Sequence, residues 1–159
     1  MNIRVVSVGK IKEKYLRDGI DEYAKRLSRY CKLYFEQVTD EKTPDGASST
    51  EEAFIRKTEG ERILKKIKEN DFVIALAIQG TMYDSETFAG YLEKLAIQGI
   101  SNIVFVIGGS LGLSDAVLAR SDFQLSFSKM TFPHQLMKMI LLEQIYRSYR
   151  IIQHEPYHK

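Results

Sequence analysis

Three short segments rich in glycine and hydroxyl side chains could form a ligand site through their backbone. They are Leu76–Thr81 (LAIQGT), Ile107–Gly112 (IGGSLG) and Leu125–Phe132 (LSFSKMTF). Glycine lets a ligand approach the peptide backbone closely, although a tight turn that binds nothing needs glycine equally. Each segment lies at the end of a predicted strand, and ligands bind at the carboxyl ends of strands in open α/β sheets. The three segments together therefore favour a binding site.

The class of ligand is narrowed by exclusion. The sequence contains no G-x-x-x-x-G-K-[ST], and Gly108–Gly112 does not match G-x-G-x-x-G, so nucleotides held by their phosphates are disfavoured. Apolar side chains would line the turns: Leu76, Leu111, Met130 and Phe132. Such a lining suits a cofactor with a flat adenine and little negative charge, and S-adenosylmethionine is such a cofactor.

The segment Gln153–Lys159 (QHEPYHK) gathers two imidazoles, a carboxylate, a phenol and a cation. It matches the metalloprotease pattern H-E-x-x-H, but that pattern binds zinc only on a helix. Pro156 disfavours a helix because it lacks an N–H and pushes Glu155 out of helical conformation, so we expect no metal. The segment is either a solvated polar tail or a cover over the site that supplies a base, a stacking surface and a phosphate contact.

The elements that must position these segments alternate between strands and helices. Strands are predicted over Asn2–Val8, Lys32–Val38, Phe72–Ile78, Ile103–Ile107 and Asp122–Phe127. Helices are predicted over 13–30, 51–68 (with Ser49 and Glu52 as a capping box), 84–96 (capped by Asp84 or Ser85), 114–120 and 133–149. This alternation predicts one α/β domain over residues 1–159, with a mostly parallel, three-layer sheet.

The last predicted helix is apolar around more of its circumference than one buried stripe requires. Its apolar residues are Leu136, Met137, Met139, Ile140, Leu141, Leu142, Ile145, Tyr146 and Tyr149. Either this helix lies centrally in the fold, or its second face meets another subunit. We favour a twofold homodimer.

Composition restricts the class of protein further. The chain has 159 residues, of which 44% are hydrophobic and 28% charged, and this excludes a disordered or collagenous chain. Its apolar runs are too short to cross a bilayer and Met1–Lys14 lacks a signal-peptide core, so we expect a cytoplasmic protein without a membrane partner. The single cysteine, Cys31, excludes a disulfide framework and is expected as a half-buried thiol.

The formal net charge of +2 conceals alternating blocks of charge. Residues 1–35, 54–70 and 126–159 carry +5, +3 and +3, whereas 36–53 and 71–125 carry −5 and −4. The basic blocks at the two ends are compatible with a surface for nucleic-acid phosphates, although solvated helix faces would give the same counts.

Several motifs together resemble the small RlmH branch of the SPOUT methyltransferases. They are Ile107–Gly112, Leu125–Ser126 with Thr131–Leu136, Glu143–Arg147, Pro156–Lys159 and the opening Ile3–Lys10. The resemblance covers essentially the whole chain. Many members of that branch end in Asn-His-Pro-Tyr-His-Arg, whereas this chain reads His-Glu-Pro-Tyr-His-Lys over 154–159.

The resemblance implies an α/β fold with a carboxyl-terminal trefoil knot, a homodimer, and S-adenosylmethionine bound in the knot. It also implies methylation of nitrogen 3 of a pseudouridine in a large-subunit rRNA hairpin of the assembled ribosome. A tRNA ribose methyltransferase of the same fold and a ribosome-binding assembly factor without catalysis are the alternatives.

The family's site residues carry over to matching positions of this chain. The expected cofactor-binding residues are Leu76, Gly80, Gly108, Gly109, Phe127, Ser128, Lys129, Met130, Thr131 and Phe132. The candidates for catalysis are Tyr157 and His158 in the tail, His134 beside the third segment, and Arg147 or Lys159 to hold phosphate or stabilise a developing anion. His134 could instead cap its helix, and a lysine at 159 does not replace a bidentate arginine.

Overall fold

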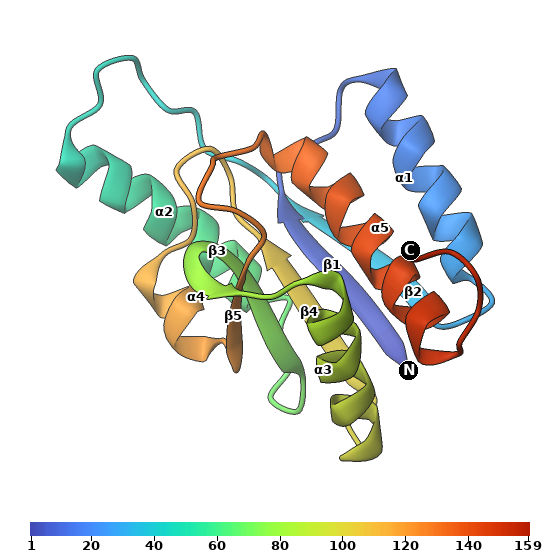
Figure 1. Ribbon diagram of the computed structural model, residues 1–159. Coiled ribbons are helices and arrows are strands. Elements are labelled where there is room, and N and C mark those ends of the chain that lie inside the picture. Colours follow the sequence, from blue (N-terminus) through green and yellow to red (C-terminus); the bar gives the residue numbers. More distant parts are fainter.

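Ten elements alternate along the chain in the computed structural model, which describes all residues from Met1 to Lys159 (Figure 1). The strands are β1 (Asn2–Val8), β2 (Lys32–Val38), β3 (Phe72–Met82), β4 (Asn102–Ile107) and β5 (Phe123–Ser126). The helices are α1 (Lys14–Leu27), α2 (Ser49–Leu64), α3 (Ser85–Ile97), α4 (Asp115–Arg120) and α5 (His134–Ile152). The strands form one sheet in the order β2-β1-β4-β3-β5, and every pair is parallel. The predicted α/β class is confirmed.

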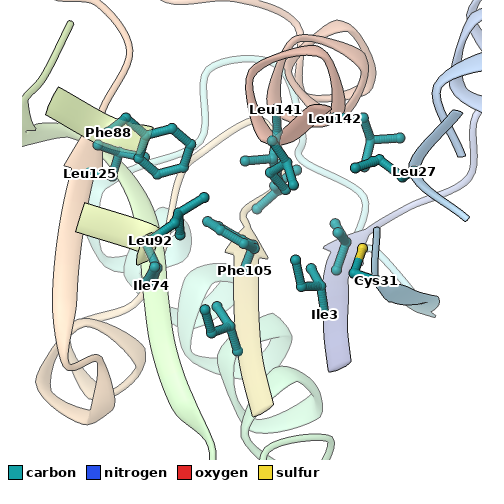
Figure 2. Close-up of a cluster of buried hydrophobic side chains, with 14 of the residues drawn as sticks. Ile3, Leu27, Cys31, Ile74, Phe88, Leu92, Phe105, Leu125, Leu141 and Leu142 are labelled. Atoms are coloured by element: carbon teal, nitrogen blue, oxygen red, sulfur yellow. The ribbon is translucent and has the colours of Figure 1, made fainter. Parts of the chain in front are cut away.

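The sheet is the middle of three layers. Helices α1, α3 and α5 cover one face, and α2 and α4 cover the other (Figure 1). Residues of β4 alternate between the two faces: Phe105 joins the larger apolar cluster, whereas Val104 and Val106 join the smaller one. The larger cluster also contains Cys31, which is a free thiol and is buried more deeply than predicted (Figure 2).

Helix α5 lies centrally, between α1 and α3. Its fully buried positions include Leu141, Leu142 and Ile145, and Figure 2 shows Leu141 and Leu142 facing the sheet. Its flanks are covered as well, since Met139 reaches Gly19 of α1 and Tyr146 packs against Tyr23 and Tyr30. The wide apolar circumference is thus used largely within one chain, and the homodimer stays a prediction. None of the helices combines the length and apolar character needed to cross a bilayer.

Two predicted boundaries are wrong for identifiable reasons. Helix α2 is capped by Ser48, which forms a capping box with Glu51, one residue before the predicted pair. Both serines fit the same spacing, so the pattern alone could not choose between them. Strand β3 runs on to Met82, because a bulge after Leu76 loops the chain out before pairing with β5 resumes at Thr81. Gln79–Gly80, which we expected to end the strand, belongs to this bulge.

The connection from β5 to α5 crosses the sheet. Strand β5 is at one edge, beside β3, whereas α5 begins next to the end of β1, where a Cβ on Gly9 would lie 3.4 Å from His134 Nε2. Because β3 and β4 lie between β5 and β1 in the sheet, Phe127–Pro133 passes over the carboxyl ends of these two strands. This crossing is the path that a carboxyl-terminal trefoil knot requires.

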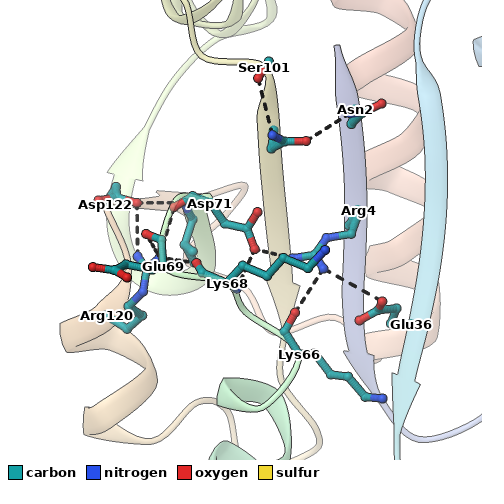
Figure 3. Close-up of polar contacts among 12 residues, drawn as sticks. Asn2, Arg4, Glu36, Lys66, Lys68, Glu69, Asp71, Ser101, Arg120 and Asp122 are labelled. Carbon is teal, nitrogen blue, oxygen red and sulfur yellow. Dashed lines mark hydrogen bonds and ion pairs between the residues drawn. The ribbon is translucent and has the colours of Figure 1, made fainter.

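A polar network fixes the opposite, amino ends of the strands (Figure 3). Arg4 of β1 pairs with Asp71, whose side chain is almost fully buried just before β3. Arg120 donates to the carbonyl oxygen of Asp71, and the Asp122 carboxylate accepts from the peptide N–H of Val73 at 2.8 Å. These contacts join α4, β1, β3 and β5, and they leave the carboxyl ends of the strands free for the loops.

Candidate functional site

The three segments predicted to bind a cofactor are brought together by the fold. They follow or end β3, β4 and β5, which are neighbours in the sheet (Figure 1). Two glycines allow the close approach. A Cβ on Gly80 would lie 2.7 Å from the backbone of Gln124, and a Cβ on Gly108 would lie 2.8 Å from the backbone of Gly112. A larger residue at 80 would push β3 away from β5, and a larger residue at 108 would disrupt the turn within the second segment.

The third segment offers unused backbone donors. Ser126 Oγ donates to the carbonyl oxygen of Ser128, and Ser128 Oγ accepts from the peptide N–H of Met130 at 2.9 Å. Further peptide N–H groups have no acceptor in the chain. In the third segment they are those of Ser128, Lys129, Thr131 and Phe132, and in the neighbouring segment those of Gly108, Ser110 and Leu111. Groups of this kind bind the polar edges of a ligand.

Side chains around these donors are mixed in character. Leu76, Phe127 and Phe132 are half-buried and apolar, whereas Lys129, Met130 and Thr131 are exposed. Unpaired peptide donors beside half-buried apolar surfaces fit a ligand with a flat ring and polar edges, so the residues present fit S-adenosylmethionine. Two hollows of the structure lie away from these segments. One, of about 300 Å³ between Met1, Leu92 and Ile152, is at the amino ends of the strands, and one lies along β2.

His134 is the first residue of α5 and sits beside the end of β1. It does not cap its helix, because Pro133 occupies the N-cap position and no side chain bonds there. Burial lowers the pKa of the His134 imidazole, and the nearby ammonium of Lys138 lowers it further, against the opposing effect of Asp40 and Glu13. The imidazole is therefore neutral at pH 7 and has a free lone pair to accept a proton.

The tail is folded against α5. The helix ends at Ile152, and His154 adopts a left-handed conformation with φ of 55°, which reverses the chain. Arg150 then donates to the Glu155 carboxylate and to the carbonyl oxygen of Pro156, both at 2.7 Å, and Tyr30 donates to Glu155 at 2.9 Å. Of the two interpretations of this segment, the solvated tail is wrong. The H-E-x-x-H sequence is not helical, as Pro156 predicted.

Three of the candidate catalytic residues converge in the tail. Arg147 Nη1 lies 3.1 Å from His158 Nδ1, and the Arg147 guanidinium stacks on the Tyr157 ring at 4.6 Å. Glu143 accepts hydrogen bonds from Arg147 at 3.0 and 3.1 Å and from the Tyr157 hydroxyl at 2.7 Å. His158 Nε2 also lies 3.5 Å from Glu86 at the start of α3, which follows the β3 segment. The tail therefore reaches the end of the sheet at which the three predicted segments meet.

These contacts decide which groups can accept a proton. Burial and the hydrogen bond to Glu143 raise the pKa of Tyr157 to about 12, so its hydroxyl is a donor. Because a guanidinium only donates, His158 Nδ1 accepts from Arg147 and its lone pair is occupied. Lys159 is exposed. His134 is separate from this group, since it lies nine positions before Glu143, about 14 Å along the helix axis.

Sequence reasoning missed two residues of α5. Glu143 joins Arg147 and Tyr157, and its position four residues before Arg147 was the signal for an ion pair on one helix face. Lys138 is 3% exposed. Its position three and four residues before Leu141 and Leu142 placed it on the buried face, which the apolar periodicity alone could have shown.

Comparisons with known proteins agree with this architecture. Residues 1–158 match the family described as “Predicted SPOUT methyltransferase”. The chain is 61% identical to a protein of Clostridium beijerinckii, 57% to one of Clostridium acetobutylicum and 61% to one of Clostridium tetani, over 159 residues and the full length of both chains in each pair. All three are named “Ribosomal RNA large subunit methyltransferase H”. A solved structure of a probable methylase family protein from Haemophilus influenzae shares the fold, with a TM-score of 0.53 at 12% identity over 99% of this chain and 70% of that one.

Proposed function

Because the chain belongs to the SPOUT methyltransferases, and within them to the large-subunit rRNA methyltransferase H group, we propose that it methylates nitrogen 3 of a pseudouridine in large-subunit rRNA on assembled ribosomes. The methyl donor is S-adenosylmethionine. The observation that supports this proposal best is the convergence of three loops with free peptide donors at one end of the sheet, where the tail also arrives.

The chemistry defines what the protein must do. S-adenosylmethionine supplies an electrophilic methyl group on a sulfonium. The ring nitrogen forms the new N–C bond as the S–C bond breaks, and the nitrogen must give up its proton. In-line alignment contributes ~7 to 11 kcal/mol to such a reaction, and a general base contributes ~10²- to 10⁴-fold. The fold therefore has to align two ligands and accept one proton.

The side chains divide these tasks. His134 is the proposed base, because it is neutral and adjoins the third cofactor segment, whereas Tyr157 and His158 are engaged with Glu143 and Arg147. Arg147 lies too far along α5 from His134 to contact the same ring in one chain, and its permanent positive charge can instead hold an RNA phosphate. Tyr157 and His158 position that guanidinium. The cofactor-binding residues proposed are Leu76, Gly80, Gly108, Gly109 and Phe127–Phe132.

Four broader properties are part of this proposal. The chain acts as one domain over residues 1–159, without a metal, and as a homodimer. Because its substrate is the ribosome, it acts in the cytoplasm. A domain of this size has little surface for RNA beyond its own catalytic fold, so a second copy and the ribosome must supply further contacts.

The decisive experiment measures methyl transfer from labelled S-adenosylmethionine to whole ribosomes, isolated large subunits, free rRNA and tRNA. We expect transfer to whole ribosomes, at one pseudouridine, and a raised melting temperature with the cofactor. Transfer to tRNA alone would instead indicate a tRNA ribose methyltransferase. A Tyr157→Phe and His158→Ala double variant as active as the wild type would remove the tail from the mechanism. Cofactor binding without any transfer would indicate an assembly factor.

A further inference from the structure

Lys138 carries a buried charge without a counter-charge. It is 3% exposed, on the face of α5 that packs on the sheet. It forms no hydrogen bond or ion pair, and its one polar contact is with the Phe35 ring, whose centroid lies 5.5 Å from Nζ. Burial lowers the pKa of Lys138 to about 8. An ammonium in such a place costs free energy, and an aromatic face does not neutralise it.

A second buried polar group without a partner lies on the same side of the sheet. The hydroxyl of Ser7 is fully enclosed and has no hydrogen-bond partner. Ser7 is two residues beyond Val5, which pairs with Phe35, so alternation along the strand points its side chain to the face that α5 covers. Two unsatisfied polar groups thus accompany the first turns of α5.

The beginning of α5 provides further donors. Pro133 gives no cap, and the peptide N–H groups of His134, Gln135 and Leu136 have no acceptor in the chain. The positive end of a long helix attracts anions, and side chains on a helix lean toward its N-terminus. Lys138 is one turn further on, and its ammonium is close enough to His134, the first residue of α5, to help lower the pKa of that imidazole. Its Nζ is not among the polar atoms that the fold encloses completely.

The location favours RNA as the source of the anion. The predicted cofactor segments follow β3, β4 and β5, whereas α5 begins beside β1, next to Gly9. The loop after Gly9 exposes Lys10, Lys12 and Lys14. The acidic groups near His134, Asp40 and Glu13, form no ion pair with Lys138 and leave its charge unneutralised.

We propose that Lys138 and the first turn of α5 bind a phosphate group of the RNA substrate beside the methylated nucleotide. This inference rests on the proposed function and gives the RNA backbone a fixed position next to His134. Ser7 contributes a second buried polar group on the same face of the sheet. The bound oxyanion supplies the counter-charge that the chain lacks.

The test compares Lys138→Met with Lys138→Arg and with a control, Lys94→Met, which removes an exposed charge from the far end of α3. We measure binding of an rRNA hairpin across a salt series, binding of S-adenosylmethionine, and thermal unfolding. Lys138→Met should weaken RNA binding about tenfold and reduce the salt slope by about 1, with cofactor affinity unchanged. Lys138→Arg should retain binding, and Lys94→Met should match the wild type.

Thermal unfolding separates this result from misfolding. Lys138→Met should melt at or above the wild-type temperature, because it removes an unpaired buried charge. Inorganic phosphate should raise the melting temperature of the wild type and not that of Lys138→Met.

Three outcomes would overturn the inference. The first is that Lys138→Met binds RNA as tightly as the Lys94→Met control. The second is that Lys138→Met loses cofactor affinity alone, which would assign the site to the cofactor's carboxylate. The third is that Lys138→Met loses self-association, which would place the counter-charge in a second copy. Because RNA binding is measured without turnover, failure of the proposed methylation would be seen separately.

Discussion

Glu143 connects Arg147 to Tyr157, and its substitution should therefore affect catalysis through two other side chains. Glu143→Gln keeps the shape but removes the charge that holds both guanidinium donors and the phenol. We expect kcat for methyl transfer to fall about tenfold or more, since the loss of a partner in such a network costs ~1 to 3 kcal/mol. Cofactor affinity should not change.

The matched control is Glu93→Gln, which removes an exposed carboxylate from α3. Both variants are assayed with saturating cofactor. If Glu143→Gln behaved like the control, the tail network would have no role in the reaction.

His134 predicts a specific pH dependence. The pKa of its imidazole is lowered from the usual value near 6.5, so the base is charged only at pH values below that. We expect kcat/KM of the wild type to fall on the acid side, with an apparent pKa below 6.5. His134→Asn should lower the rate by ~10²-fold or more and remove this limb. His154→Asn, at an exposed position in the tail, should keep it. An unchanged limb in His134→Asn would assign the base elsewhere.

The sequence identified most of the groups at the site but not how they are arranged. Tyr157, His158 and Arg147 do lie together, because Arg150 and the left-handed turn at His154 fold the tail back on α5. No local pattern specifies that reversal, since it depends on contacts with Tyr30 of another element. The separation of His134 from the tail follows from the length of α5 and could have been calculated.

At the level of elements, the close packing of β3 on β5 depends on Gly80. In Gly80→Ala the new methyl group would lie 2.7 Å from the backbone of Gln124, and backbone cannot move aside as a side chain can. We expect a loss of ~2 kcal/mol or more in the free energy of unfolding, together with weaker cofactor binding. Gly90→Ala, on the open face of α3, meets nothing within 4 Å and should stabilise by ~0.5 to 1 kcal/mol. Urea unfolding measures both, and equal stability of the two variants would contradict the packing argument.

The predicted boundary of an element agrees with the structure where a single residue determines it. Gly99 follows the end of α3 with φ of 88°, as predicted, and Asp84 is the N-cap of α3, a position that the sequence left open between Asp84 and Ser85. Prediction was poorer where two residues fit equally, as with Ser48 and Ser49, and where tertiary pairing extended an element, as with β3 beyond Ile78. The bulge at Gly80 exists because β5 needs a partner there, and β5 is more than 40 residues further along the chain.

For the whole molecule, the blocks of charge predict how RNA binding responds to salt. Lys10, Lys12 and Lys14 are exposed beside the start of α5, within the basic block 1–35. A variant with all three changed to Gln should bind rRNA more weakly and lose up to about 3 from the slope of log affinity against log salt.

The control for this triple variant changes Lys57, Lys65 and Lys68, which are exposed in the other basic block, 54–70. It removes the same charge and should leave the slope closer to that of the wild type. Equal effects of both variants would show that only net charge matters. The α/β fold class that the alternation of strands and helices predicted holds in the structure.

The passage of Phe127–Pro133 over the ends of β3 and β4 constrains the order in which the protein can assemble. Helix α5 can pack between α1 and α3 only after Phe127–Pro133 has crossed the sheet. The slow step of refolding therefore brings together segments that are distant in the sequence. Unfolding has to retrace it. Curves of denaturation and renaturation should therefore show hysteresis, and the lifetime of the folded enzyme is set by a kinetic barrier as well as by its free energy of unfolding.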